Sequence, residues 1–454
     1  MHKKQIRPLA RLHGYWIYKQ FLSRTGAWTE REKRAYVFER LKQTLIQADE
    51  GIPFYRERFR QAGFNPKADF GSVEDLRHLP ILTKADVRTH HTEMVDRRFL
   101  STSVVANTSG TTGQPMTMRL GLGYIAVDYA CMYRFWAQAG YTFRAPCAAI
   151  RSYVPASAAG PLWKYNYWQN TLYMSAYHLK PSNSQDYVQA LLKFRPAFIR
   201  GYASSVNVLA EYALPYREQF DFVRGIFTAS ETLLDYERKT IEQTFGKKLY
   251  DWYGMTEPAV VITETANHEG MEVNWEYGYP EFLEGEGLES NERRLMATSL
   301  HNPVMPFIRY QTDDIVRMAG GVASPGQIHP KIEAVVGRKD EYILTPDGGR
   351  LPSLNFYSLL QGYADILKFQ FVQRDLSHVT MKIAVRPGAR NVPAMVSKLH
   401  EETMRRLGAQ MNIEIEQTEE FERSPDGKTP AFKRLFRPEA VHANSAALAS
   451  QQYK

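Results

Sequence analysis

Apolar positions in the middle of the chain alternate between short continuous runs and runs with helical spacing. The helical spacing predicts helices within residues 187–194, 206–212 and 236–245, the last of which ends at Gly246. The continuous runs predict strands within residues 145–150, 195–202 and 222–231. Because strands that alternate with helices are typical of a parallel sheet covered by helices, the sequence predicts an α/β fold.

Helical patterns also dominate the N-terminal part of the chain. We expect one helix over residues 29–60 and another, capped by Thr83, after the apolar run that begins at Leu79. Beyond residue 122, apolar and aromatic residues again recur at helical spacing, which is more typical of a core than of a ligand pocket. The basic and aromatic segment 11–22 fits a helix that packs on its own domain better than a helix on a membrane surface.

The pattern changes in the C-terminal third, where β-like runs are shorter. These runs predict strands at 295–300, 307–310, 367–372, 379–385 and 413–417, and a helix at 393–407 lies between the last two. We therefore expect a large N-terminal domain of helix-covered, mainly parallel sheets over residues 1–337 and a small α+β domain over residues 338–440. Residues 441–454 are rich in Ala, Ser, Gln and Asn, and we expect a disordered tail.

Composition narrows the class of protein. The 57 basic and 49 acidic residues give a formal charge of +8, but they are scattered, which argues against nucleic-acid binding and suits an anionic ligand such as a nucleotide. The only cysteines are Cys131 and Cys147, so neither a disulfide framework nor zinc-ligand spacing is present, and a cytoplasmic location is expected. No run approaches the roughly 18 apolar residues of a transmembrane helix, and no secretory signal is expected.

A loop rich in glycine and hydroxyl groups follows the strand expected at 103–105. It consists of Thr108, Ser109, Gly110, Thr111, Thr112 and Gly113. Glycines let the backbone approach a ligand, and successive N–H groups and hydroxyls can then hold phosphate oxygens. The loop is not a Walker A motif, because Gln114 stands where a lysine might be expected. On its own it is either a phosphate-binding loop or a solvated loop.

Two further loops carry groups that suit a nucleotide. Residues 251–258 contain Tyr253, Gly254, Met255, Thr256 and Glu257. An aromatic ring can stack on a purine and a carboxylate beside phosphates can hold Mg²⁺, although Glu257 alone fits a helix-start carboxylate equally well. Asp313 and Asp314 end a run of β character, where a carboxylate can accept hydrogen bonds from ribose hydroxyls or simply form an Asx turn.

The fourth stretch lies at the expected domain boundary, and the fifth lies near the C-terminus. Arg338 and Asp340 belong to a Gly-Arg-Lys-Asp run, and Lys428 sits in a glycine turn within residues 424–434. A lysine in such a turn is in most cases only solvated. Each of the five stretches is weak alone, and their order makes them specific.

In this order the five stretches resemble the adenylate-forming (acyl-CoA synthetase-like) superfamily, most closely its branch of phenylacetate–CoA ligases and capsular-polysaccharide adenylate-forming proteins. The resemblance runs from about Leu79 to Arg434. The runs Gly270–Asn274 and Pro306–Tyr310 are also similar to this branch. It implies that a carboxylate attacks the α-phosphate of ATP, with Mg²⁺ bound, and that a thiol, in most of the branch that of coenzyme A, then attacks the acyl-adenylate.

The resemblance also implies a role for each residue. The loop 108–113 would hold the β- and γ-phosphates, Ser230 and Glu231 would border the adenine, and Tyr253 would stack on it. Thr256 would touch the α-phosphate, Glu257 would hold Mg²⁺, and Asp314 would bind the ribose hydroxyls with Arg338 nearby. Lys428, on a mobile small domain that turns at Asp340, would bridge the substrate carboxylate and the α-phosphate, because two anions must be brought together.

Three departures from the family pattern stand out. Gln114 replaces a lysine, and we expect altered phosphate affinity rather than lost activity. Residues 345–352 replace the usual loop beside the thioester tunnel, which puts coenzyme A as acceptor in question. Residues 163–177 are rich in Trp and Tyr, and either line the acyl pocket or, as we favour, cover the sheet.

The sequence thus predicts an AMP-forming acid–thiol ligase, with coenzyme A as the expected acceptor. Aromatic residues near the expected acyl site weakly favour an aryl or bulky apolar acid, namely Tyr133, Phe135, Trp136, Tyr141 and Phe143. One alternative keeps adenylation but passes the acyl group or AMP to an amine, a carrier-protein thiol or a sugar. Another is a non-catalytic nucleotide-binding or membrane-associated scaffold. The oligomeric state is left open, with a homodimer as one option.

Overall fold

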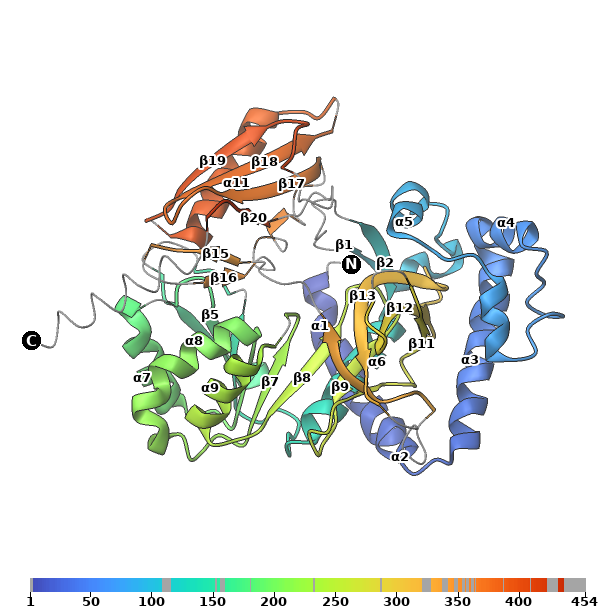
Figure 1. The fold of residues 1–454 in the computed structure, drawn as a ribbon, viewed down its shortest axis with the longest axis horizontal. Helices are drawn as coiled ribbons and strands as arrows, with labels where there is room; N and C mark the ends of the chain where they lie inside the picture. Colours follow the sequence, from blue (N-terminus) through green and yellow to red (C-terminus); the bar gives the residue numbers. More distant parts are fainter. Residues whose placement is uncertain are drawn as a thin grey trace, which may run out of the picture. The chain divides into compact units, whose positions relative to one another are not determined.

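The structure is a computed structural model, and its helices and strands are shown in Figure 1. It describes residues 3–107, 116–151, 153–155, 160–179, 181–231, 233–285, 288–320, 328–336, 342–346, 350–352, 356, 359–360, 363, 365–386, 388–408, 410–422 and 432–436. The α-helices are α1 (Lys3–Ile17), α2 (Ser23–Thr25), α3 (Glu30–Gly51), α4 (Pro53–Gln61), α5 (Lys84–His90), α6 (Leu122–Ala137), α7 (Ser184–Phe194), α8 (Ala203–Ala213), α9 (Asp235–Phe245) and α11 (Val392–Leu407).

The strands fall into a first set up to residue 254 and a second set beyond it. The first set is β1 (Ser103–Asn107), β2 (Thr117–Gly121), β3 (Cys147–Arg151), β4 (Trp163–Asn166), β5 (Thr171–Ser175), β6 (Phe198–Gly201), β7 (Gly225–Ala229) and β8 (Leu249–Gly254). The second set is β9 (Val261–Glu264), β10 (Met271–Val273), β11 (Gly278–Leu283), β12 (Glu292–Ser299), β13 (Tyr310–Met318), β14 (Ile332–Val336), β15 (Tyr342–Leu344), β16 (Arg350–Pro352), β17 (Ile366–Gln373), β18 (His378–Val385), β19 (Asn412–Gln417) and β20 (Phe432–Arg434).

The chain divides into two compact units, and each is described by itself. The first unit consists of residues 1–108, 116–143 and 250–337, and the second consists of residues 109–115, 144–249 and 338–454. The predicted domain limits at residues 337, 338 and 440 remain a prediction.

The second unit contains the predicted alternation of strands and helices. Its strands run in the order β7-β6-β3-β5-β4, with parallel pairing from β7 to β5 and antiparallel pairing of β4 on β5. Helices α7, α8 and α9 lie beside these strands (Figure 1). Apolar residues of one sheet face and of the three helices form one core, which includes Ile150, Ile199, Ile226, Leu191, Leu209 and Ile241. In parallel strands the carboxyl ends share one edge, so residues that follow β3, β6 and β7 are brought together there.

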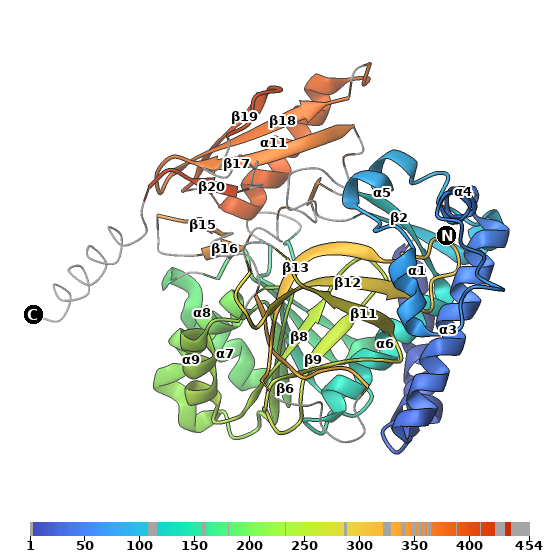
Figure 2. The same cartoon turned by 45° about the vertical axis from the view of Figure 1, so that its right-hand side comes forward.

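A four-stranded sheet in the C-terminal part of the second unit has the order β19-β18-β17-β20 (Figure 2). Its strands and α11 share a separate apolar core, which includes Phe369, Met381 and Leu399. The strands and helix expected at 367–372, 379–385, 393–407 and 413–417 are confirmed as β17, β18, α11 and β19.

In the first unit the strand pairs are antiparallel and follow the order β11-β12-β13-β14-β10-β9-β8. The hairpin β1–β2 leads into α6, on which the expected aromatic stripe is buried at Tyr124, Cys131 and Phe135. Helix α1 packs on α6 at Gly14, where a Cβ would lie 2.6 Å from both the Ala126 carbonyl oxygen and the Tyr129 Cβ. Among the described residues, no helix combines the length and the apolar character needed to cross a membrane.

Two predicted elements in the first unit are wrong in detail. The helix expected over 29–60 is broken at Ile52, which is extended (φ −125°, ψ 107°) because the following Pro53 disfavours helical backbone at the preceding residue. The strand expected over 307–310 begins only at Tyr310, since Arg309 adopts φ +50°. The Thr83 cap is confirmed, and Asp86 completes a capping box with it.

The chain that follows Glu257 lies directly against β11 in the first unit. A Cβ built on Gly278 of β11 would overlap the carbonyl oxygen of Ala259. The obstacle is backbone rather than the end of a flexible side chain, so only glycine fits at this position. This contact sets how closely the residues just after β8 pack against β11.

Gly278→Ala is therefore expected to lower the free energy of unfolding by about 1–3 kcal/mol or more, the usual cost of overpacking. Denaturant unfolding followed by circular dichroism measures the change. Gly123→Ala in α6 is the matched control, because a Cβ there meets nothing within 4 Å and should be neutral or stabilising by up to about 1 kcal/mol. Equal stability of the two variants would contradict the packing argument.

Candidate nucleotide-binding site

The predicted site residues fall into three groups. Tyr253, Gly254, Met255, Thr256, Glu257 and Asp314 belong to the first unit, and Ser230 and Glu231 belong to the second. Thr108, Ser109, Gly110, Thr111, Thr112, Gly113, Gln114, Arg338, Asp340 and Lys428 lie outside the described residues. The first two groups are described separately below.

Tyr253, near the end of β8, is joined to Asp314 of β13. Its hydroxyl donates a hydrogen bond to Asp314 Oδ2 at 2.6 Å. Burial raises the pKa of Tyr253 well above its ordinary value, and the Asp314 carboxylate adds to this shift. The phenol therefore stays protonated and acts as a donor that fixes the orientation of the carboxylate.

The neighbouring aspartate has a different partner. Asp313 adopts φ +66° and its Oδ2 lies 2.9 Å from the Lys84 ammonium, which also donates to the Thr312 carbonyl at 3.1 Å. The unusual backbone turns Asp313 towards Lys84, while Asp314 remains with Tyr253. Asp313 thus forms a salt bridge with Lys84, whereas the adjacent Asp314 is held by the neutral phenol of Tyr253.

Sequence reasoning missed Lys84. It reaches the aspartates because the segment before α5 pairs with the start of β13: the Leu82 N–H donates to Arg309 O at 3.0 Å and the Gln311 N–H donates to Leu82 O at 2.9 Å. The signal in the sequence was a lysine directly after the Thr83 helix cap. Only the long-range pairing shows where that lysine lies.

Glu257 is a buried carboxylate, with 8% of its surface exposed. Its Oε1 accepts a hydrogen bond from the Tyr310 hydroxyl at 2.9 Å. Burial raises the pKa of Glu257, and the charge of Lys84 opposes that shift. A cation close to this carboxylate would offset the cost of its burial.

One carboxylate fits a magnesium ion that arrives with a triphosphate, because Mg²⁺ usually binds one or two protein carboxylates and keeps waters and phosphate oxygens as its other ligands. Within the described ranges, no group of three or more His, Cys, Asp or Glu residues could hold a metal ion. A site that the single Glu257 carboxylate shares with the phosphates of a nucleotide fits this arrangement.

The loop between Tyr253 and Glu257 keeps its shape through close packing. A Cβ on Gly254 would lie too close to Nε1 of the Trp252 indole ring, so a larger residue there would force the ring to shift. Met255 and Thr256 are half-buried. Thr256 precedes the buried Glu257 directly, so the loop presents a hydroxyl and a carboxylate next to each other.

In the second unit, Ser230 and Glu231 follow β7 at the carboxyl edge of the parallel strands. Ser230 adopts φ +76°, an uncommon conformation for a residue other than glycine that is often found at functional sites. Glu231 Oε2 accepts hydrogen bonds from the Ser204 hydroxyl at 2.8 Å and from the Ser204 N–H at 3.1 Å. Burial raises the pKa of Glu231 to about 7.

The aromatic segment 163–177 divides between two environments. Trp163 packs on the Tyr187 ring at 5.6 Å and joins the core of the second unit, as expected for a segment that covers the sheet. Tyr167 and Trp168 are exposed.

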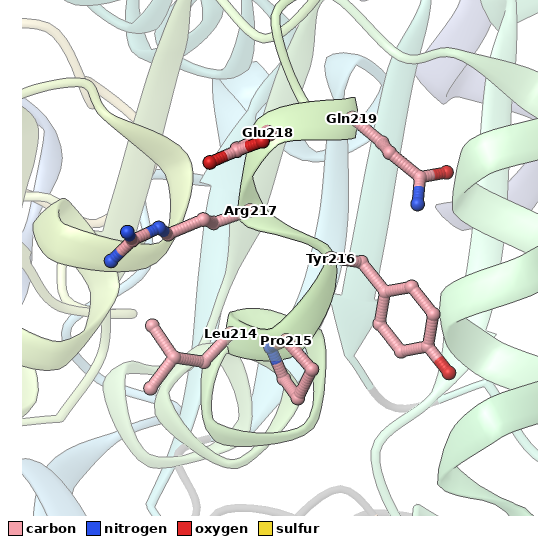
Figure 3. Close-up of a pocket in the computed structure, with 6 residues that line it drawn as sticks. All are labelled: Leu214, Pro215, Tyr216, Arg217, Glu218 and Gln219. Atoms are coloured by element: carbon pink, nitrogen blue, oxygen red, sulfur yellow. The ribbon is translucent and has the colours of Figure 1, made fainter.

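A separate hollow of about 410 Å³ is lined by Leu214, Pro215, Tyr216, Arg217, Glu218 and Gln219. Figure 3 shows these six side chains. All six come from one turn, and no predicted site residue is among them.

The chain is similar to one family model and to several known proteins. Residues 343–434 match the family model of the CapK C-terminal domain. Protein CapK of Staphylococcus aureus is 26% identical over 382 residues, which is 83% of each chain. The phenylacetate-coenzyme A ligase of Pseudomonas putida is 28% identical over 334 residues, which cover 68% of this chain and 72% of the relative.

The family-model match and the relatives confirm the predicted resemblance to the adenylate-forming superfamily, and the relatives named as ligases confirm the prediction of an enzyme of the ligase class. The fold class is confirmed by a crystal structure of 2-hydroxyisobutyryl-CoA ligase in complex with 2-HIB-AMP and CoA, which is 21% identical with a TM-score of 0.57 and covers 92% of this chain and 93% of that chain.

The raised pKa of Glu231 predicts a pH-dependent stability for this protein. The folded state binds the proton more tightly than the unfolded chain, whose ordinary value is near 4.5. The stabilising contribution is therefore present below pH 4.5 and is lost as the pH rises to about 7.

Glu231→Gln removes this titration and keeps an oxygen that can accept the Ser204 hydrogen bonds. Between pH 5 and pH 8, the wild type should lose stability relative to this variant in denaturant unfolding. Glu218→Gln, at an exposed position of the same unit, should follow the wild type. Parallel pH profiles for wild type and Glu231→Gln would contradict the assignment.

Proposed function

We propose that this protein activates a carboxylic acid with ATP to give an acyl-adenylate and pyrophosphate, and then transfers the acyl group to a thiol, with coenzyme A as the favoured acceptor. The arrangement of carboxylates in the first unit is the main support. Asp314 is oriented by a neutral phenol, and Glu257 is buried beside a lysine and a tyrosine. The relatives named as ligases support acid activation and thioester formation in general terms.

Each residue of the first unit has a proposed role. Tyr253 stacks on the adenine and Asp314 accepts the ribose hydroxyls, for which a carboxylate held in one orientation is well suited. Thr256 contacts the α-phosphate. Glu257 holds magnesium that is bound to the phosphates, and the ion would neutralise charge on the triphosphate.

The remaining roles belong to the second unit and to residues outside the described ranges. Ser230 and Glu231 border the adenine. The loop 108–113 holds the β- and γ-phosphates, and Arg338 lies near the ribose. Lys428 bridges the substrate carboxylate and the α-phosphate, because a cation is needed to reduce the repulsion between two anions that must react.

A second proposal concerns the acceptor. The match to the CapK C-terminal domain and the CapK relative favour an adenylate-forming enzyme that passes the acyl group or AMP to an amine, a carrier protein or a sugar. The unusual residues 345–352, of which Arg350–Pro352 form β16, lie inside the matched domain. The acceptor is therefore the least constrained part of the proposed reaction.

ATP–pyrophosphate exchange with a panel of aryl, fatty and amino acids tests adenylation directly. At least one acid should support exchange, and release of AMP with that acid should rise when coenzyme A is added. Exchange without any effect of coenzyme A would support the second proposal. Absence of exchange with all acid classes would contradict both proposals.

Lys428→Ala should reduce exchange by about 10²–10³-fold, because one well-placed charged donor contributes on the order of 3–4 kcal/mol to the barrier. ATP binding, measured by calorimetry, should be largely kept. Lys398→Ala, at an exposed position of α11, is the control and should leave exchange unchanged. If Lys428→Ala also left exchange unchanged, the lysine role would be wrong, as a non-catalytic scaffold predicts.

A further inference from the structure

The segment before Glu30 has a charge pattern that differs from the rest of the chain. Basic residues are spread along the whole sequence, but no aspartate or glutamate precedes Glu30. Lysine or arginine occurs at positions 3, 4, 7, 11, 19 and 24. Six of the 57 basic residues and none of the 49 acidic residues thus lie in this segment, which supplies most of the formal charge of +8. A local excess of positive charge of this kind attracts anionic surfaces.

Helix α1, which carries the first part of this segment, covers α6 with one of its faces. Ala10 is buried, and at Gly14 the two helices approach so closely that a Cβ would lie 2.6 Å from the Ala126 carbonyl oxygen. The Tyr15 ring packs edge-on against the Tyr133 ring of α6, with centres 5.3 Å apart. Because rotation of α1 about its axis would bring a larger side chain to the place of Gly14, this packing fixes which face of the helix is covered.

Another face of α1 is apolar and open. Leu9, Leu12 and Trp16 follow one another at three- and four-residue spacing, so they share one face of the helix, on the side away from Ala10 and Gly14. Their exposed fractions are 67%, 55% and 60%. Among the described residues of the first unit, no other large apolar side chain is as exposed. We call these three residues the exposed α1 face.

Polar groups at the border of the exposed α1 face suit a boundary between water and an apolar phase. The rings of His13 and Trp16 lie 6.1 Å apart, and His13 is also exposed. Lys19 and Arg24, which follow the helix, are exposed as well. Tryptophan has an apolar body and an N–H donor, which favour the membrane–water interface, and lysine and arginine can extend their charged ends to lipid headgroups.

We propose that the exposed α1 face docks on the surface of an anionic lipid bilayer. Helix α1 keeps its contact with α6 while Leu9, Leu12 and Trp16 enter the headgroup region. The basic side chains of the segment, among them Lys19 and Arg24, bind the anionic headgroups. This inference goes beyond the proposed function, because it concerns the surface on which the protein acts and involves no residue of the nucleotide-binding site.

Charge favours a lipid surface over a second copy of this chain. A two-fold interface would place the exposed α1 face of one copy against the same face of the other, and with it two segments that contain no acidic residue. Like charges would then lie close to one another across an apolar contact, which is unfavourable. An anionic bilayer instead offers opposite charge and an apolar interior in one surface.

Co-sedimentation of the full chain with large unilamellar vesicles tests the proposal. Vesicles of phosphatidylcholine are compared with vesicles that contain equal amounts of phosphatidylcholine and phosphatidylglycerol. Wild type should partition onto the anionic vesicles at least tenfold more strongly. The partition coefficient should fall at least fivefold when NaCl rises from about 50 to about 300 mM, because salt screens the attraction. Equal partitioning onto both kinds of vesicle, or none onto either, overturns the proposal.

The double variant Leu12→Gln/Trp16→Gln tests the apolar contribution. It should weaken partitioning onto the anionic vesicles at least fivefold, whereas Trp16→Phe, which keeps an aromatic ring, should retain most of the binding. Trp168→Gln is the matched control and should bind like wild type, because Trp168 is an even more exposed tryptophan, at 81%, but belongs to the second unit. All of these side chains are exposed, so thermal unfolding should give Tm values close to that of wild type.

Unchanged vesicle binding by the double variant would overturn docking through the exposed α1 face and leave only a general attraction of positive charge. A loss with Trp168→Gln as large as that of the double variant would also overturn it. Analytical ultracentrifugation tests the other occupant: a dimeric wild type and a monomeric double variant, neither of which binds vesicles, would assign the face to a second copy. Vesicle binding is measured without substrate, so its outcome does not depend on the proposed reaction.

Discussion

The structure of the first unit depends on holding several carboxylates close together without letting them repel one another. Lys84 forms a salt bridge with Asp313, its charge also acts on Glu257, and Asp314 is held by a neutral phenol. One cation and two tyrosine hydroxyls thus stabilise three carboxylates. A nucleotide with its magnesium ion would bring further positive and negative charge to a site whose own charges already have fixed partners.

The backbone conformation determines much of this arrangement of charged groups. The pairing of Leu82 with the start of β13 carries Lys84 to the aspartates, and the φ of +66° at Asp313 turns adjacent side chains towards different partners. In the second unit, parallel strands place Arg151, Arg200 and Ser230 at one edge. In both units, residues far apart in the sequence meet because strand ends coincide.

The sequence was most informative where local rules are strong. Helical spacing predicted α7 to α9 and α11, and the Thr83 cap and the turn at Gly246 were visible from residue type alone. The break at Ile52 was not predicted although Pro53 can be read from the sequence, because the helical spacing of apolar residues continues through residues 52 and 53. The position of Lys84 could not be predicted, since it follows from the long-range pairing of Leu82 with β13. The role of Lys428 still rests on resemblance.

The overlap that a side chain would cause at Gly278 limits which substitutions the sequence can accept during evolution. Glu257 lies two residues before a backbone-to-backbone contact between Ala259 and Gly278, and its carboxylate also accepts a hydrogen bond from Tyr310. Because the backbone contact does not depend on the shapes of nearby core side chains, those residues are freer to be exchanged during evolution. Position 278 has no such freedom, so homologous proteins that use an equivalent carboxylate in this loop should retain a glycine there.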